Sequence, residues 1–346
     1  MKYKFSIQQR VFHFKQPAGT SRGIYTTRTS WFIKVWEPDN PAVYGIGECA
    51  PLLDLSCDAL ENYEGVLNGI CNIVFQTGII NDKLLRPYPS MLFGIETALL
   101  SLQRDGSTAL SDTPFAHGKE GIPINGLVWM GNYDEMLERL HVKLQDGFKC
   151  VKLKIGAIDF EKELELIKVI RENFNCKQLQ LRVDANGGFL PKEAMKRLEI
   201  LTKYDIHSIE QPIRQHQWRE MAELCKYSPL PIAFDEELIG INSKEMKNNL
   251  LDCLSPQYIV LKPSLHGGMS GTEEWIKLAN ERNIKSWITS ALESNVGLNA
   301  IAHLAARVYG PKITFPQGLG TGQLFTDNIE LPIKMKNNQI WYLKNS

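Results

Sequence analysis

The sequence predicts an α/β fold in which parallel strands close into a modified (β/α)8 barrel. From Ile122 onward, short apolar strands alternate with helical segments, a pattern typical of a parallel sheet. Eight candidate strands occur, and 346 residues leave room for structure outside a barrel of about 250 residues. An open doubly wound sheet is the alternative, but no glycine-rich dinucleotide fingerprint follows the first strand.

The region before the barrel has two patterns. Residues 2–14 and 29–37 alternate like strands, and the Gly/Ser/Thr-rich loop 16–27 between them resembles a hairpin connection that could reach over a site. The segment GIGECAPL ends this part. Residues 57–105 show the apolar spacing of helices, most clearly in MLFGIETALLSLQ.

The barrel elements follow in alternation. Eight segments are predicted strands: 122–129, 150–156, 179–186, 206–212, 230–237, 258–264, 284–291 and 312–320. The helices predicted between them are 133–147, 160–174, 192–204, 218–227, 244–254, 272–283 and 294–310. After the last strand comes only the strand-like tail 331–346, which could return to the N-terminal region, so the final barrel helix is missing or displaced.

Composition excludes several classes of function. Lys+Arg and Asp+Glu both number 39, so the formal charge is zero, which argues against nucleic-acid and anionic-membrane partners. No apolar run is long enough to span a bilayer, and the N-terminus lacks a signal-peptide block. Seven dispersed cysteines without a CxxC pair indicate free thiols. We expect a cytoplasmic protein that acts on a small molecule.

Three successive predicted strands end in carboxylates: Asp184 in RVDAN, Glu210 in SIEQP and Asp235 in AFDEE. Gaps of 26 and 25 residues separate them, about one β/α unit each. Because catalytic groups of a barrel gather at the carboxyl ends of its strands, these acids should converge and require a cation. Oxygen ligands alone favour Mg²⁺, with Mn²⁺ as a substitute, whereas zinc would call for His or Cys. The alternative is that each acid only caps the next helix.

Lysines flank the acids on both sides. The strand VKLKIG carries Lys152 and Lys154 on one face, and YIVLKPS carries Lys262, 27 residues after Asp235. A carboxylate substrate held at the metal would then have an ammonium group on each face. This arrangement suits proton abstraction next to a carboxylate, with the metal stabilising the enediolate and a lysine as base. Lys152 could instead be a surface lysine.

The motifs KLK, DAN, IEQP, FDE and LKP, in this order over residues 122–322, resemble the enolase superfamily in its muconate-lactonising-enzyme-like subgroup. The resemblance implies an α+β capping domain of residues 1–120, completed by 323–346, on a modified (β/α)7–8 barrel of residues 121–322. It also implies that loops such as Gly19–Thr27 and Ala50–Leu52 close over the substrate.

Within the subgroup, RVDAN with Arg182, TSALESNVGLNAIAHLAA with Ser290 and PQGLGTGQLFTDN resemble the o-succinylbenzoate synthases of menaquinone biosynthesis. Such enzymes are Mg²⁺-dependent lyases that dehydrate a cyclohexadiene carboxylate through an enediolate. The resemblance implies that Lys154 is the base, that Lys262 stabilises the enediolate and that Asp184, Glu210 and Asp235 bind the metal. The predicted substrate contacts are Lys152, Arg182, Ser290, Gly318 and Gly320, and Glu236 should contact Lys262.

Two alternatives use the same kind of site. Dipeptide epimerases carry an acidic DxD-type motif at the eighth strand, where ITFPQGLGTGQLF has no acid before Asp327. N-acylamino acid racemisation is harder to separate from dehydration by sequence. A non-catalytic barrel is disfavoured because inward lysines and acids destabilise a fold that has no ligand for them. His266, beside the glycine pair in LHGGMSG, has no assigned role, and Trp129 and Trp275 are interpreted as core aromatics.

Overall fold

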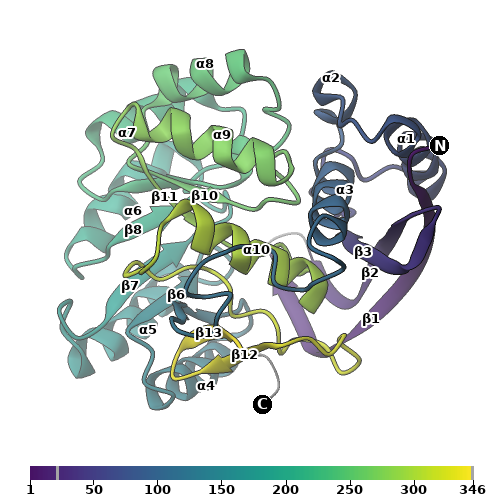
Figure 1. Ribbon diagram of the computed structural model, residues 1–346. Helices are drawn as coiled ribbons and strands as arrows, with labels where there is room; N and C mark the ends of the chain where they lie inside the picture. Colours follow the sequence, from purple (N-terminus) through teal and green to yellow (C-terminus); the bar gives the residue numbers. More distant parts are fainter. Residues whose placement is uncertain (21–22, 344–346) are drawn as a thin grey trace.

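The computed structural model describes residues 1–20 and 23–343, and Figure 1 shows two parts side by side. The N-terminal part is an antiparallel sheet of β1 (Lys4–Thr20), β2 (Gly23–Glu37) and β3 (Asn40–Cys49) with α1 (Tyr63–Thr77), α2 (Asp82–Leu85) and α3 (Pro89–Leu102). The predicted loop 16–27 is largely strand, because β1 and β2 pair up to Thr20 and Gly23. Residues 21–22 of the predicted lid loop lie outside the described residues.

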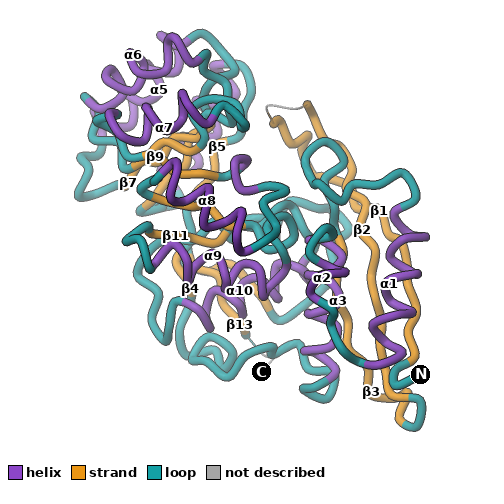
Figure 2. The backbone as a smooth tube through the Cα atoms, turned by 90° about the horizontal axis from the view of Figure 1, so that it is seen from above, coloured by secondary structure: helices purple, strands orange, loops and turns teal. Residues whose placement is uncertain are grey.

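Helix α3 packs closely on β3 because glycines face it. A Cβ on Gly45 would lie 1.9 Å from the Ala98 carbonyl oxygen, and one on Gly47 would lie 1.8 Å from that of Gly94. Only glycine permits this approach. The apolar face of the sheet, including Ile33 and Val35, is buried against α1 and α3. Figure 2 shows β1 and β2 running side by side past α1 toward the barrel.

The second part is a curled parallel sheet with helices outside it. Its strand order follows the chain: β5 (Gly126–Val128), β6 (Cys150–Lys154), β7 (Gln180–Asp184), β8 (Ser208–Glu210), β9 (Ile232–Phe234), β10 (Tyr258–Leu261) and β11 (Lys285–Ile288). The helices are α4 (Tyr133–Gln145), α5 (Phe160–Asn173), α6 (Pro191–Thr202), α7 (Trp218–Tyr227), α8 (Lys244–Leu254), α9 (Gly268–Asn280) and α10 (Asn295–Val308). A 3₁₀ turn, Glu236–Leu238, follows β9. The predicted strand–helix alternation is therefore confirmed for these elements.

The predicted eighth strand, 312–320, is the exception. Only residues 317 and 318 bridge to neighbours, Gln317 to Ile124 and Gly318 to Thr289. Gln317 exchanges backbone hydrogen bonds with Pro123 and Asn125, and Gly318 with Ile288 and Ser290. This short segment closes the ring between β11 and residues 123–125. The fold is thus a modified barrel with an α+β domain beside it, as predicted.

The tail pairs elsewhere than with the N-terminal sheet. Strands β12 (Ile333–Lys336) and β13 (Gln339–Tyr342) form a small sheet with β4 (Ile122–Pro123). An earlier stretch of the tail does reach β1, because Thr326 donates its N–H to His13 and Lys15 donates to Leu324. The division at residues 120/121 and 322/323 stays a prediction. None of the helices formed by the described residues has the length and apolarity of a membrane span.

Two carboxylates of the N-terminal part cap barrel helices. Glu48, fully buried on β3, accepts hydrogen bonds from the N–H groups of Ser294 (2.9 Å) and Gly297 (2.8 Å) at the start of α10. Glu96 of α3 accepts from the N–H of Met269 (2.6 Å) at the start of α9. Unpaired N–H groups at a helix start attract anions, so these contacts join the two parts.

Candidate active site at the carboxyl ends of the barrel strands

Alternation along the barrel strands decides which side chains face inward. Val151 and Leu153 of β6 and Val183 of β7 belong to the apolar layer between strands and helices. Their neighbours in the chain therefore point into the barrel. The register places Lys154 beside Asp184 and Asp184 beside Glu210 on adjacent strands. The predicted lysines and acids thus share one interior surface.

A cavity of about 710 Å³ opens above this surface. Lys15–Ala18 and Tyr25 of the β1–β2 hairpin line one side, together with Leu52 and Leu55 of the loop after β3. The barrel floor of the cavity is polar, and its lining includes Lys152, Lys154, Asp184, Asn186, Glu236 and Lys262. The cavity therefore lies between the two parts of the molecule, and Tyr25 and Leu52 of the predicted lid segments line it.

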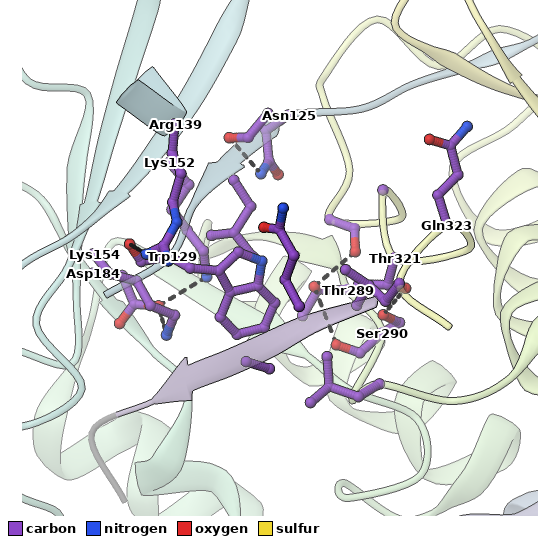
Figure 3. A pocket seen from close by; sticks show the side chains of 18 of the residues that line it. Asn125, Trp129, Arg139, Lys152, Lys154, Asp184, Thr289, Ser290, Thr321 and Gln323 are labelled. Atoms are coloured by element: carbon purple, nitrogen blue, oxygen red, sulfur yellow. Dashed lines mark hydrogen bonds and ion pairs between the residues drawn. The ribbon is translucent and has the colours of Figure 1, made fainter. Parts of the chain in front are cut away.

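Lys152 and Lys154 share the carboxylate of Asp184. Lys152 Nζ lies 2.9 Å from Asp184 Oδ2 and 3.0 Å from Glu210 Oε1, while Lys154 Nζ lies 3.1 Å from the same Asp184 oxygen. Lys154 Nζ also donates to Asn186 Oδ1 at 2.5 Å. Figure 3 shows both lysines at the cavity next to Asp184. Lys152 is buried in this network and is not a surface lysine.

Lys262 approaches from the opposite side of the acids. Its Nζ is hydrogen-bonded to Asp235 Oδ2, and its backbone N–H donates to His266 Nδ1 at 2.9 Å. His266 is buried, and its Nε2 has no hydrogen-bond partner in the described part of the chain. Glu236, the predicted contact of Lys262, accepts a hydrogen bond from Asn186 Nδ2 at 2.9 Å, and its interaction with Lys262 is electrostatic.

Burial and close charges shift these pKa values in opposite directions. Burial alone would raise the pKa of Asp184, but the adjacent Lys152 and Lys154 outweigh it and hold that pKa well below its usual range. For Glu210, burial and the charge of Asp184 outweigh Lys152 and raise the pKa to about 8. Burial would lower the pKa of Lys262, yet Asp235 and Glu236 raise it. The ammonium groups therefore act as the cations that balance the acids.

The chemistry of the acids fits a hard divalent ion. Residues 1–20 and 23–343 contain no group of three or more Asp, Glu, His or Cys side chains placed so that they could hold a metal ion. The carboxylates Glu210 and Asp235 contact lysines in this arrangement. Even so, Asp235 Oδ1 and Glu236 Oε2 are buried without a hydrogen-bond partner among these residues. Unpaired buried carboxylate oxygens next to other acids are suited to Mg²⁺.

The predicted substrate contacts separate into two groups. Ser290, Gly318 and Gly320 line the cavity, and Ser290 Oγ lies 2.5 Å from Thr321 Oγ1. A Cβ on Gly318 would lie 2.2 Å from Thr289 Oγ1, so the backbone approaches closely there. Figure 3 shows Thr289, Ser290 and Thr321 as a group of hydroxyls across the cavity from the lysines.

Arg182 is not brought to the cavity. It lies beside Lys152 in the sheet register, but its guanidinium stacks 4.3 Å from the ring of Trp287 and 4.5 Å from that of Phe315. Its three guanidinium nitrogens have no hydrogen-bond partner among the described residues, and burial lowers its pKa. Arg182 is thus part of the barrel interior beneath the site, and its predicted contact with the substrate stays a prediction.

Sequence reasoning missed several cavity residues. Trp129, interpreted as a core aromatic, lines the cavity, whereas Trp275 is fully buried as predicted. Asn186 and Thr321 contact Lys154 and Ser290, respectively. Their positions in the sequence could have identified them as cavity residues. Trp129 directly follows the first barrel strand, and Asn186 follows Asp184 by two residues. Residues just after barrel strands face the catalytic end.

Comparisons with known proteins agree with this geometry. Residues 135–330 match the family model described as "Enolase C-terminal domain-like". The o-succinylbenzoate synthase of Desulfotalea psychrophila is 45% identical, over 94% of this chain and 95% of that protein. The crystal structure of MenC from the same organism superposes with a TM-score of 0.82 at 39% identity, covering 99% of this chain and 100% of that chain.

The more distant relatives include epimerases as well as further o-succinylbenzoate synthases. The L-Ala-D/L-Glu epimerase of Bacillus subtilis is 25% identical over 78% of this chain and 75% of that protein. Residues 312–325 of this chain contain no acidic residue. The chain therefore belongs to the enolase superfamily and, within it, to the o-succinylbenzoate synthase family.

Proposed function

We propose that the chain is an o-succinylbenzoate synthase, a lyase that removes water from 2-succinyl-6-hydroxy-2,4-cyclohexadiene-1-carboxylate to give o-succinylbenzoate for menaquinone biosynthesis. The observation that carries the proposal is the pair of lysines at opposite sides of one cavity. Lys154 on β6 and Lys262 after β10 both line it, and acids from the strands between them lie at its floor. The identity with the Desulfotalea psychrophila synthase supports the same reaction.

In this proposal Asp184, Glu210 and Asp235 hold Mg²⁺, for which Mn²⁺ can substitute. The bound ion would neutralise the substrate carboxylate and the negative charge that develops on it. Enzymes of the superfamily generally use a divalent metal. The buried, unpaired Asp235 Oδ1 supports a ligand role for that residue. With the ion present, the acids would be shared between the ion and the lysines Lys152, Lys154 and Lys262.

Lys154 would supply the proton transfers. Its neutral Nζ takes the proton from the ring carbon that bears the carboxylate, which leaves an enediolate. The resulting ammonium returns that proton to the hydroxyl on the neighbouring carbon, and the C–O bond breaks to release water on the same face. Lys262 stabilises the enediolate by its charge from the other side. Asn186, 2.5 Å from Lys154 Nζ, orients the base.

The cavity wall supports a substrate without an ammonium group. The segment across from the lysines offers Ser290 and the backbone of Gly318 and Gly320, and residues 312–325 contain no acid to pair with an amine. A succinyl carboxylate can instead accept hydrogen bonds from hydroxyl and N–H groups there. The seven free cysteines support a location in the cytoplasm, where thiols stay reduced.

The test is a direct assay with the cyclohexadiene. Wild-type protein with Mg²⁺ should abolish the diene absorbance and yield o-succinylbenzoate, and EDTA should stop the reaction. N-succinylamino acids are assayed in parallel for exchange of the α-proton in D₂O. Absence of dehydration together with EDTA-sensitive racemisation of the N-succinylamino acids would refute the synthase assignment and favour the racemase.

A further inference from the structure

Trp129 has the surroundings of a ligand-binding aromatic. It follows β5 directly and lines the cavity, and in the view of Figure 3 its indole lies between the Lys154–Asp184 pair and the Thr289–Ser290 hydroxyls. Trp275 and Trp287, by contrast, are 0% and 1% exposed in the barrel. Trp129 therefore presents part of its ring to the space that the substrate must fill.

The position of the Trp129 ring is well defined by its neighbours. The indole packs against the apolar cluster beneath the hairpin that includes Leu52 and Leu292. Arg139 Nη1 donates to the carbonyl oxygens of Trp129 (3.2 Å) and Met130 (2.8 Å), which holds the backbone of this turn. Within the described residues no hydrogen bond engages the indole N–H, so a ligand can accept it.

Resting on the proposed function, we infer that Trp129 is the residue that recognises the ring of the substrate. The six-membered ring of the substrate and product is bound against the indole face, with its carboxylate toward the lysines and its succinyl chain toward Ser290. The aromatic product carries two carbonyl substituents that withdraw electrons, which strengthens its stacking on the electron-rich indole. Trp129 thereby sets a preference for a planar cyclic acid over a flexible acylamino acid.

The test uses the Mg²⁺-loaded protein, o-succinylbenzoate as the planar ligand and N-succinylvaline as the flexible one. Trp129→Leu removes the π-face and Trp129→Phe keeps a smaller one. Trp36→Phe, on β2, is the matched control because Trp36 does not line the cavity. Calorimetry measures both affinities, and tryptophan emission reports on contact with the ligand directly.

Trp129→Leu should weaken o-succinylbenzoate about tenfold, and Trp129→Phe by no more than about threefold, the range set by aromatic pair energies. Affinity for N-succinylvaline should change less than about twofold in both, since it offers no ring to stack. The emission change on adding o-succinylbenzoate should disappear in both Trp129 variants and persist in Trp36→Phe.

Two results would overturn the inference: equal loss of affinity for both ligands in Trp129→Leu, or an emission change that persists in Trp129→Phe. These outcomes are distinct from failure of the proposed function. If wild-type protein does not dehydrate the cyclohexadiene, the synthase proposal fails. If it does so, and the ratio of the two affinities is unchanged by Trp129→Leu, only the role of Trp129 fails.

Discussion

Glu48 offers the sharpest test of how the two parts are joined. Its Oε1 accepts from Ser30 Oγ (2.7 Å) and the Ser294 N–H, and its Oε2 accepts from Ser294 Oγ (2.6 Å) and the Gly297 N–H. Glu48→Gln keeps the shape of the side chain but turns one acceptor into a donor. A hydroxyl can rotate to accept from the new amide, whereas a backbone N–H cannot.

The expected loss of stability follows from this difference between hydroxyl and backbone N–H donors. One buried N–H at the start of α10, from Ser294 or Gly297, would face another N–H and lose a hydrogen bond to a charged acceptor. Losing the bond and leaving the donor unpaired should together cost about 3–4 kcal/mol. With an unfolding entropy of about 2.1 cal/mol/K per residue over 346 residues, the melting temperature should fall by about 4–6 °C.

Differential scanning calorimetry of Glu48→Gln measures this shift. Glu37→Gln, an exposed glutamate at the end of β2, is the matched control and should melt within about 1 °C of wild type. If Glu48→Gln melts no lower than Glu37→Gln, the buried carboxylate does not stabilise the start of α10, and the account of the junction between the two parts is wrong.

Three further predictions concern the base, a buried acid and a buried histidine. Lys154→Ala should lower kcat at least about 100-fold, whereas Lys149→Ala, at an exposed lysine nearby, should not. Activity of Lys154→Ala within tenfold of wild type would contradict the role of Lys154 as base. Burial raises the pKa of Asp58 from 3.8 to about 6, so the folded state binds the extra proton and stability falls as pH rises through this window. In urea unfolding, Asp58→Asn should reduce the loss of unfolding free energy between pH 4 and pH 7 by about 3 kcal/mol. If the pH dependence of the unfolding free energy is the same as in wild type, Asp58 does not have this raised pKa. His266→Leu leaves the Lys262 N–H unpaired and should cost about 1–3 kcal/mol in the same assay, with a lower kcat; unaltered stability would show that this hydrogen bond matters little.

The core of the site was predictable because strand geometry is local. Two lysines two residues apart must share a face, and acids one β/α unit apart must meet at one rim. The register of Lys154, Asp184 and Glu210 on adjacent strands confirms this reasoning. Strand geometry does not determine side-chain rotamers, so the rotamers could not be predicted from the sequence.

Lys152 and Arg182 show the limit. They are register partners on β6 and β7, yet Lys152 turns up to the acids and Arg182 turns toward Trp287. Which way a long side chain turns depends on the pockets that other strands create, and those are set by residues distant in sequence. Trp129 shows the same limit, because it packs against an apolar cluster and also lines the cavity, which its position after a strand does not reveal.

The eighth strand and the tail were predicted from their local strand-like pattern, which does not determine the strand with which each pairs. Residues 312–320 are apolar enough for a strand, but Pro316 lacks an N–H and the segment makes only isolated bridges at 317 and 318. The tail 333–342 alternates like an edge strand and pairs with β4. Pairing between segments more than 200 residues apart depends on the assembled fold.

The contact between β1 and residues 324–327 has a consequence for biosynthesis. Lys15 and His13 hydrogen-bond with Leu324 and Thr326, more than 300 residues later in the chain. The ribosome delivers the wall from Gly318 to Leu324 only after every parallel strand has been made. A nascent chain can therefore assemble its lysines and acids early and still lack an enclosed reaction chamber. Catalytic competence should arise only after residues 318–326 have been synthesised, as a single late event rather than by degrees.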